Sequence, residues 1–457
     1  MKHDNDQLDA RLQEFYSGDV PVLTFDENWV TKTGRGGLGV RWLNRGYVTA
    51  LVGVLVVAMI SVIWVGYSNR HSPRNLMAGI QASHIAIDMQ DADLGPAMSD
   101  FGVGLLRQVL EPGQNCLVSP LSAEMALAMT ANGANGHTLA QMLEVLAGGA
   151  YLTQLNAYLK EYAGNLPNEK NARLQMANSI WYNNQQKMDI TSGFLQANAD
   201  WFDAGAYAAP FNAQTVKDMN NWVAKYTDNM IKDLVKSLDP EMSAMVLLNA
   251  LAFNAKWQQP YYDSNIVDDT FTAGNGVSQA AQFMHSTEST YLDDGKATGF
   301  VKPYDQDGYR FVALLPKVGV SISDYLASLN WLATMGTATP DAVEVALPEF
   351  GFDYSVKMND ALSAMGMPDA FSDAADFSPM GTMNGQPLHI GMVQQKTYIG
   401  VTPLGTTAGA ATEVEMIAAS QMVALKQVTL DRPFIFAIVD SRSELPIFVG
   451  VVNSVDG

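Results

Sequence analysis

Residues 405–420 read GTTAGAATEVEMIAAS and combine the composition of a surface loop with the alternation of a half-buried strand. Both carboxylates of the stretch, Glu413 and Glu415, fall on one side of that alternation, where they can stay in water. The other side carries only small or apolar residues, which are Thr406, Ala408, Ala410, Thr412, Val414 and Met416. A loop that needs only to be soluble has no reason to keep its charges on one side. The pattern therefore predicts a segment able to become a strand.

The composition of the chain limits which folds, partners and cysteine chemistry it can have. Of its 457 residues, 48% are hydrophobic and 16% are charged, which is ample for a large packed core. The net charge of −20 argues against nucleic acid and heparin-like partners, because phosphate- and sulfate-binding surfaces need clustered Lys and Arg. A single cysteine, Cys116, excludes an intramolecular disulfide and zinc sites with paired thiolates. In the apolar run CLVS it is predicted to be a buried structural thiol.

The N-terminal region is organised differently. Residues 1–45 are polar and without sustained periodicity, which predicts a flexible cytoplasmic tail. Residues 46–67 (GYVTALVGVLVVAMISVIWVGY) form an uncharged run of about 22 residues, long enough for a transmembrane helix. More basic residues precede this run than follow it, so we expect the N-terminus in the cytoplasm and residues 68–457 outside. A cleaved signal peptide is the competing interpretation, although its leading segment would be far shorter.

Residues 68–94 are predicted to be a linker, and residues 95–457 read as one α+β domain without internal repeats. Helical spacing comes first and strand-like runs dominate the second half. The expected helices are Ser122–Asn132 and Val216–Tyr226. The expected strands are Leu174–Tyr182, Ala244–Asn254, Arg310–Leu315, Val343–Leu347, Leu388–Val401 and Pro433–Val439.

Motifs of catalysis are missing from the sequence. No H-E-x-x-H pattern, G-x-S-x-G elbow or P-loop occurs, and the six histidines are scattered. The GRGGLG stretch at Gly34–Gly39 matches a dinucleotide-binding pattern, but an apolar run follows it instead of the required helix and acidic residue. We therefore expect no enzyme activity, no metal and no cofactor.

The order of the segments resembles the serpin family. VSPLSAEMALAMTANGA (118–134), ANSIWYNN, LLNALAFNAKW (247–257) and VALPEFGFDYSVKM are similar to serpin segments in the same order. DRPFIFAIVDSRSELPIFVGVVNSV (431–455) resembles the C-terminal serpin signature. The resemblance covers residues 95–455 and suggests a membrane-anchored serpin of bacterial type. It implies a large central mixed sheet, surrounding helices and an exposed reactive-centre loop.

The resemblance also implies site residues. The loop hinge would comprise Gly405, Thr406, Thr407, Ala408, Gly409, Ala410, Ala411 and Thr412. Counting about fourteen residues from the hinge glycine, as in inhibitory serpins, gives Ala419–Ser420 as the reactive bond, with Ala418–Ala419 as the alternative. Three residues would have structural roles, Trp257 in the breach at the upper end of the sheet and Ser119 with Asn178 in the shutter below it.

Three positions depart from the family pattern. Pro403 stands two residues before Gly405, where serpins usually place Glu, and Glu349 replaces the basic residue that often pairs with that Glu. Proline removes a backbone donor, so we expect one lost ladder bond and a slower onset of insertion. Gln395 stands where the family commonly has the shutter histidine, beside Lys396.

The function implied is suicide inhibition of a serine protease. After cleavage the loop would insert as a strand into the main sheet, an established example of strand addition and stored strain. The small residues around Ala419 predict an elastase-like target with a shallow primary pocket. No heparin-type activator is expected, because 151–162 carries only Lys160 as a cation. A monomer is expected. The alternatives are a non-inhibitory binding protein or chaperone with this fold, and inhibition of cysteine proteases by the same loop.

Overall fold

The computed structural model describes residues 72–83, 93–185, 187–238, 244–305, 308–406 and 426–456. All of them fall within one compact unit, Ser68–Gly457. Among these residues, no helix has the length and apolarity needed to cross a membrane. The predicted cytoplasmic tail (1–45) and transmembrane run (46–67) lie outside the described residues, so those interpretations stay predictions.

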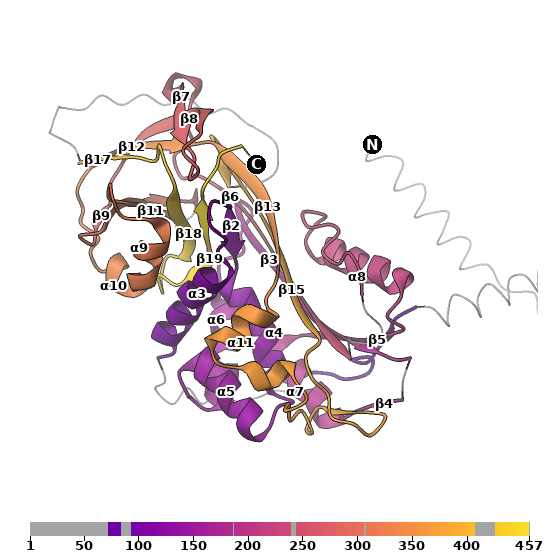
Figure 1. The fold of residues 1–457 in the computed structure, drawn as a ribbon. Coiled ribbons are helices and arrows are strands. Elements are labelled where there is room, and N and C mark those ends of the chain that lie inside the picture. The colour runs from indigo at the N-terminus through magenta and orange to yellow at the C-terminus, as the bar shows by residue number, and fades with distance from the viewer. Residues whose placement is uncertain are drawn as a thin grey trace, which may run out of the picture. The chain divides into compact units, whose positions relative to one another are not determined.

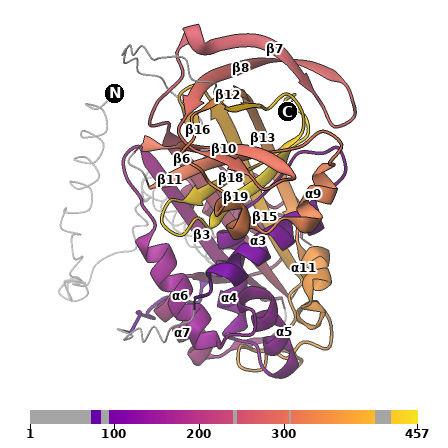
Figure 2. The same ribbon diagram turned by 90° about the vertical axis from the view of Figure 1, so that its left-hand side faces the viewer.

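The described residues form helices around four sheets (Figures 1 and 2). The helices are α3 (Gly95–Val109), α4 (Pro120–Ala131), α5 (Gly136–Ala147), α6 (Leu152–Asn165), α7 (Ser192–Phe202), α8 (Ala213–Tyr226), α9 (Ile322–Ser328), α10 (Trp331–Met335) and α11 (Asn359–Met365), with short 3₁₀ turns η2 (Asp263–Asn265) and η4 (Pro368–Phe371).

The largest sheet contains seven strands. Their order is β1 (Arg74–Asn75), β5 (Gly205–Ala209), β3 (Ala172–Asn183), β6 (Met245–Lys256), β16 (Gly405–Thr406), β15 (Met392–Thr402) and β13 (Phe350–Lys357). It is mixed, since β3 runs parallel to β5 and antiparallel to β6. The predicted large mixed sheet with surrounding helices is therefore confirmed.

Three smaller sheets complete the architecture. The first has the order β2 (Cys116–Val118), β19 (Pro446–Val452), β18 (Phe434–Asp440), β11 (Tyr309–Pro316), β10 (Ala297–Pro303) and β9 (Tyr291–Asp293). The second has the order β17 (Lys426–Thr429), β12 (Val343–Pro348), β8 (Ser278–Glu288) and β7 (Ile266–Thr272). The last pairs β14 (Gly381–Met383) with β4 (Met188–Ile190). Every strand expected from the sequence is present, although β15 begins four residues later than predicted.

Two helices cover opposite faces of the large sheet (Figure 1). Helix α4 begins at Ser119, whose Oγ accepts a hydrogen bond from the Ser122 backbone N–H, with Pro120 in the first turn. All twelve of its residues are buried, because it packs between the large sheet and the neighbouring helices. Helix α8 is amphipathic instead. Its buried residues, Thr215, Met219 and Val223, recur every four positions and face the sheet.

The segment before α3 is more than a linker. Arg74 and Asn75 pair antiparallel with Ala208 and Tyr207, which adds β1 to the edge of the large sheet. Leu76, Met77 and Ile80 are partly buried against the core. Part of the predicted linker 68–94 therefore packs on the domain, because a few apolar side chains and one free sheet edge suffice to hold an extended segment.

Candidate functional site

The predicted loop hinge begins inside the large sheet. Thr406 pairs with Val401 of β15 and Ala255 of β6, and the preceding residue, Gly405, pairs with Thr402 and Lys256. Strand β16 thus lies between β6 and β15 at the upper end of the sheet (Figure 2). The remaining hinge residues, Thr407 to Thr412, and the predicted reactive bond Ala419–Ser420 lie outside the described residues.

Farther down, β6 and β15 pair directly with each other. The parallel ladder runs from Met392↔Val246 to Lys396↔Ala250. Beyond Lys396 the two strands separate to accommodate β16. The sheet is therefore closed in its lower half and split in its upper half, with the first two residues of the loop in the split.

Only glycine fits at position 405. A Cβ added there would lie 2.2 Å from the carbonyl oxygen of Ala255 and 2.7 Å from the Cα of Lys256. Both contacts are with backbone, which cannot rotate away. The absence of a side chain is what lets the chain enter between the two strands.

Thr406 is the first loop residue whose side chain is buried by this pairing, and it is 2% exposed. Its Oγ1 lies 2.5 Å from the hydroxyl of Tyr304, a side chain that is fully buried. The hydroxyl of Thr406 therefore keeps a hydrogen-bond partner after leaving solvent.

Pro403 lies in the turn between β15 and β16, and the expected lost ladder bond is not found. Thr402 and Gly405 form the last pair of the two strands, so Pro403 and Leu404 are the two connecting residues. Proline is favoured at the first position of a turn, where its fixed φ is suitable and no ladder donor is required. Its carbonyl accepts a hydrogen bond from the Tyr261 backbone N–H (2.9 Å). The expectation of a lost ladder bond was wrong because Pro403 lies in the connecting turn, where no ladder donor is required.

Trp257 anchors this turn through two hydrogen bonds. Its backbone N–H donates to the carbonyl of Leu404 (3.0 Å), and its indole N–H donates to the carbonyl of Thr402 (2.9 Å). Its ring stacks on Tyr304 with centroids 4.5 Å apart. The residue predicted for the breach thus contacts both the turn and the tyrosine that bonds Thr406.

A buried ion pair lies beside these rings. The ammonium of Lys302, 2% exposed, is 2.7 Å from Oε1 of Glu288, which also accepts from Ser286 Oγ at 2.6 Å. The same ammonium lies 4.4 Å from the ring centroid of Tyr261 and 5.6 Å from that of Trp257. Burial lowers the pKa of Lys302, and the carboxylate of Glu288 opposes that effect. We refer to Trp257, Tyr261, Glu288, Lys302 and Tyr304 as the breach cluster.

Glu349, the other departure from the family pattern, lies between β12 and β13 and is not part of the breach cluster. It is half-buried, and burial raises the pKa of its carboxyl group. Its backbone N–H donates to the carbonyl of Gln282 at 2.8 Å.

The predicted shutter residues are joined by a chain of amide hydrogen bonds. Gln395 accepts from the backbone N–H of Ser119 (3.0 Å) and donates through Nε2 to the carbonyl of Ser119 (3.0 Å) and to Oδ1 of Asn249 (2.9 Å). Asn249 donates to Oδ1 of Asn178 (2.7 Å) and to the carbonyl of Ser122. Because Gln395 supplies both a donor and an acceptor, this network contains no titrating group where the family commonly has histidine.

Lys396, the neighbour of Gln395, reaches to the other face of the sheet. Its Nζ donates to the carbonyl of Lys232 at 2.7 Å, in the segment that follows α8. On the far side of β6, Gln175 of β3 donates to Oδ2 of Asp228 in the same segment (2.6 Å). The segment after α8 is therefore attached to strands on both sides of the seam between β6 and β15.

Two further buried titratable groups lie under the sheet. Cys116 is 1% exposed and burial raises the pKa of its thiol to about 12, so the prediction of a buried structural thiol is confirmed. Glu124 of α4 is fully buried, and neither of its carboxyl oxygens has a hydrogen-bond partner among the described residues. Burial raises the pKa of Glu124 well above its usual range, so its neutral form is favoured in the fold.

Sequence reasoning missed five residues of this site: Asn249, Tyr261, Glu288, Lys302 and Tyr304. Asn249 and Lys302 each carry a weak signal, since each interrupts an apolar run (LLNALAF and FVKPY). A polar residue inside a buried strand needs a partner. Nothing in the sequence identifies which partner that is.

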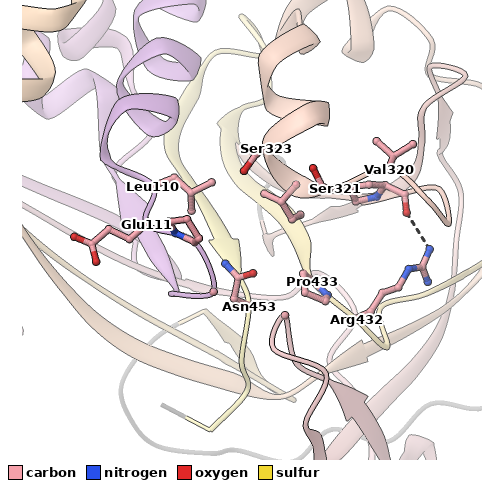
Figure 3. Close-up of a pocket in the computed structure, with 13 residues that line it drawn as sticks. Leu110, Glu111, Val320, Ser321, Ser323, Arg432, Pro433 and Asn453 are labelled. Carbon is pink, nitrogen blue, oxygen red and sulfur yellow. Dashed lines mark hydrogen bonds between the residues drawn. The ribbon is translucent and has the colours of Figure 1, made fainter.

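A separate pocket of about 280 Å³ lies away from the hinge (Figure 3). Leu110 and Glu111, which follow α3, lie on one side of the pocket, and Val320 and Ser321, which precede α9, lie on the other side with Arg432. The Arg432 guanidinium donates to the carbonyl of Pro316 and pairs with Asp431, both at 2.9 Å. Its charge is therefore already engaged, and none of the predicted site residues lines this pocket.

Comparisons with known proteins agree with this geometry. The structure of a thermophilic serpin, tengpin, in the native state superposes with a TM-score of 0.81 at 41% identity, covering 84% of this chain and 100% of that one. An uncharacterized serpin-like protein of Thermococcus kodakarensis is 31% identical over 380 residues, 80% of this chain and 87% of that protein. Serpin B6 of Bos taurus is 30% identical, covering 78% and 98% of the two chains. The model of the family described as serpin (serine protease inhibitor) matches residues 96–455, and the chain belongs to that family.

Proposed function

We propose that this protein is a suicide-substrate inhibitor of serine proteases that acts by inserting its cleaved reactive loop into the large sheet. The observation that carries the proposal is the pairing of Gly405 and Thr406 with β6 and β15. These two residues already occupy the position that an inserted strand would continue. Members of the family generally inhibit serine proteases, although some do not.

The alternation of the loop supports the same mechanism. Thr406 is buried, so each second residue after it would face the same side if the strand extended. Those residues are small or apolar up to Met416, whereas Glu413 and Glu415 would face solvent. Burying a lone charge would cost several kcal/mol, and this sequence avoids that cost throughout.

We expect the protease serine to attack the carbonyl carbon of Ala419, so that the Ala419–Ser420 bond breaks, the protease becomes acylated by Ala419 and the amine of Ser420 leaves. A methyl side chain suits a shallow primary pocket, so an elastase-like enzyme is the proposed target. Replacement of Ala419 by Arg supplies a matched specificity test, because trypsin-like enzymes require a basic side chain there.

Incubation with an elastase-like protease, followed by denaturing electrophoresis and mass spectrometry, tests the proposal. We expect a covalent band and a released peptide that begins at Ser420, and we expect Ala419→Arg to transfer complex formation to a trypsin-like protease. Cleavage without a covalent band would support the non-inhibitory binding protein or chaperone instead. A peptide that begins at Ala419 would shift the bond by one residue. A parallel incubation with a papain-like enzyme tests the cysteine-protease alternative.

We also propose that residues 46–67 anchor the protein in a membrane with the serpin domain on the outer side. The uncharged length of this run and the excess of basic residues before it support the proposal. Alkaline extraction of membranes that contain the full chain, compared with a version lacking 46–67, tests it. Release of the full chain by alkali, with no difference between the two versions, would contradict the anchor.

A further inference from the structure

The breach cluster contains a charge pair at positions unrelated to the family's usual pair. The latter positions are occupied here by Pro403 and Glu349. We propose that Lys302 and Glu288 are positioning residues for loop insertion: they hold Trp257 and Tyr261 in place, and these two residues hold the turn from which the inserted strand grows. The part of this inference that concerns inhibition rests on the proposed function.

Lys302 and Glu288 form a buried ion pair. Lys302 Nζ lies 2.7 Å from Glu288 Oε1, and both side chains are buried. Ser286 Oγ donates to the same oxygen at 2.6 Å and lies 3.3 Å from the hydroxyl of Tyr261. Glu288 thus fixes the ammonium from one side while the rings of Tyr261 and Trp257 lie on the other, at 4.4 and 5.6 Å. Desolvated cation–π contacts of this kind favour one orientation of each ring.

Trp257 and Tyr261 hold the turn through three hydrogen bonds. The backbone N–H of Tyr261 donates to the carbonyl of Pro403, the backbone N–H of Trp257 donates to that of Leu404, and the indole N–H of Trp257 donates to that of Thr402. All three turn carbonyls are therefore bonded to the two residues that the ammonium contacts. Displacement of the Trp257 ring would break the bond to Thr402, and a shift of either residue that moves its backbone N–H would weaken the bonds to Leu404 and Pro403.

The preformed turn affects how fast the loop can insert. Closing a turn is the costly part of forming a strand pair, because several backbone dihedrals are fixed before many hydrogen bonds form. In this protein the turn is already formed, and each further loop residue can extend the existing ladder. Insertion competes with hydrolysis of the acyl-enzyme. A turn that must first be reformed would therefore shift the outcome toward simple cleavage.

The competing explanation is that the pair only stabilises the fold. A double variant, Lys302→Met with Glu288→Gln, separates the two explanations. Replacing a buried ion pair by neutral side chains of similar size is often harmless to stability, whereas removing one partner leaves a buried charge. Lys302→Met alone and Glu288→Gln alone serve as the intermediate variants. Lys317→Met is the matched control, because Lys317 makes a similar ion pair with Asp293 (2.9 Å) in an exposed position.

Amide hydrogen exchange tests the positioning role without any protease. We expect the Trp257 and Tyr261 amides of the double variant to exchange about tenfold faster than in the parent, the factor that a loss of ~1.4 kcal/mol produces. Amides of β6 that bond to β3 should keep the parent rate. The proposal would be overturned if the Trp257 and Tyr261 amides of the double variant exchanged at the parent's rate, or if all amides of the variant exchanged faster by the same factor.

The number of inhibitor molecules consumed per protease inactivated is the second measurement. We expect it to rise about threefold in the double variant even where its thermal unfolding matches that of the parent, and to stay unchanged in Lys317→Met. If the double variant has both the parent's stability and the parent's number of molecules consumed per protease inactivated, the pair has no role in insertion. If the parent itself forms no covalent complex, the proposed function fails, and the exchange experiment still decides the role of the pair.

Discussion

The hydroxyl of Tyr304 and Oγ1 of Thr406 lie 2.5 Å apart in the interior of the protein, where both side chains are excluded from solvent. One residue belongs to the core and the other to the loop that the family presents to proteases. The contact shows that the buried position in β16 accommodates a small hydroxyl side chain.

Under the proposed mechanism, Thr406→Arg should be cleaved by the protease as a substrate instead of trapping it. The guanidinium would have to be buried between Val401 and Ala255, which costs several kcal/mol unless it finds a partner. Denaturing electrophoresis after incubation with the target protease should show cleaved protein in place of the covalent band. Thr270→Arg, at an exposed position of β7, is the control and should behave as the parent. Covalent complexes of Thr406→Arg at the parent's stoichiometry would contradict the hinge argument.

Gly405→Ala should expel β16 from the sheet. The added methyl group would overlap the backbone of Ala255 and Lys256, so the strand must move and its ladder bonds are lost. We expect a loss of about 1–3 kcal/mol in the free energy of unfolding, measured with denaturant. Gly193→Ala is the matched control, since nothing lies within 4 Å of the new methyl group there. Equal losses in the two variants would show that the close approach at Gly405 has no energetic consequence.

Asn249→Ala should destabilise the shutter network. The change removes one of the two acceptors of the buried Gln395 Nε2, and it removes the donor to the half-buried Asn178 Oδ1 and to the carbonyl of Ser122. A buried group left without a partner costs about 1–3 kcal/mol. Denaturant unfolding should therefore show a loss of roughly 1–3 kcal/mol. The same substitution at Asn184, in an exposed turn, should change stability little. A loss below about 0.5 kcal/mol at Asn249 would mean that the network contributes nothing.

Glu124→Gln should alter how stability depends on pH. The folded state holds the carboxyl neutral, so its pKa is raised above the unfolded value near 4.5. The stability that this group contributes is complete below pH 4.5 and is lost as pH rises, by roughly 1 kcal/mol per pH unit, until the folded-state pKa is reached. Tyr158 and Tyr162 of α6 interact with Glu124, but burial raises the pKa values of both, so they do not titrate in this range.

Thermal unfolding at pH 5 and pH 7 measures this effect. The parent should lose stability between these two values relative to Glu124→Gln, whose amide does not titrate. Glu169→Gln, at an exposed position, should retain the parent's pH dependence. Parallel curves for the parent and Glu124→Gln would show that Glu124 is ionised in the fold.

The sequence predicted the structure well where a local pattern of residues determines it. Largely apolar runs predicted β6 and β18, because strands buried on both faces have few polar positions. The alternation after Gly405 predicted a strand-forming segment, and the structure places Thr406 on the buried side. Resemblance to the family placed Trp257, Ser119 and Asn178, whose contacts lie where the hinge and the seam of the sheet are.

The partners of buried polar residues could not be predicted in the same way. Glu288 lies at the end of β8 and Lys302 lies in β10, and these strands belong to different sheets. Gln395 and Asn249 are 146 positions apart. These partners meet only when distant strands pair or when sheets pack. A polar or charged residue in an apolar run therefore looks the same in the sequence whether or not it has a partner in the fold. The lost ladder bond expected at Pro403 was wrong for a related reason, since the last paired residue of β15 depends on where the chain reverses.

Strand β1 has a practical consequence for anyone who wishes to produce the domain. Arg74 and Asn75 cover the outer edge of β5, and the region that matches the family begins only at residue 96, which is 21 positions after Asn75. A recombinant version trimmed to the family boundary would leave that edge uncovered, and bare edges promote intermolecular association and precipitation. Expression should therefore start no later than Ser72, with light scattering of the longer and shorter versions as the comparison.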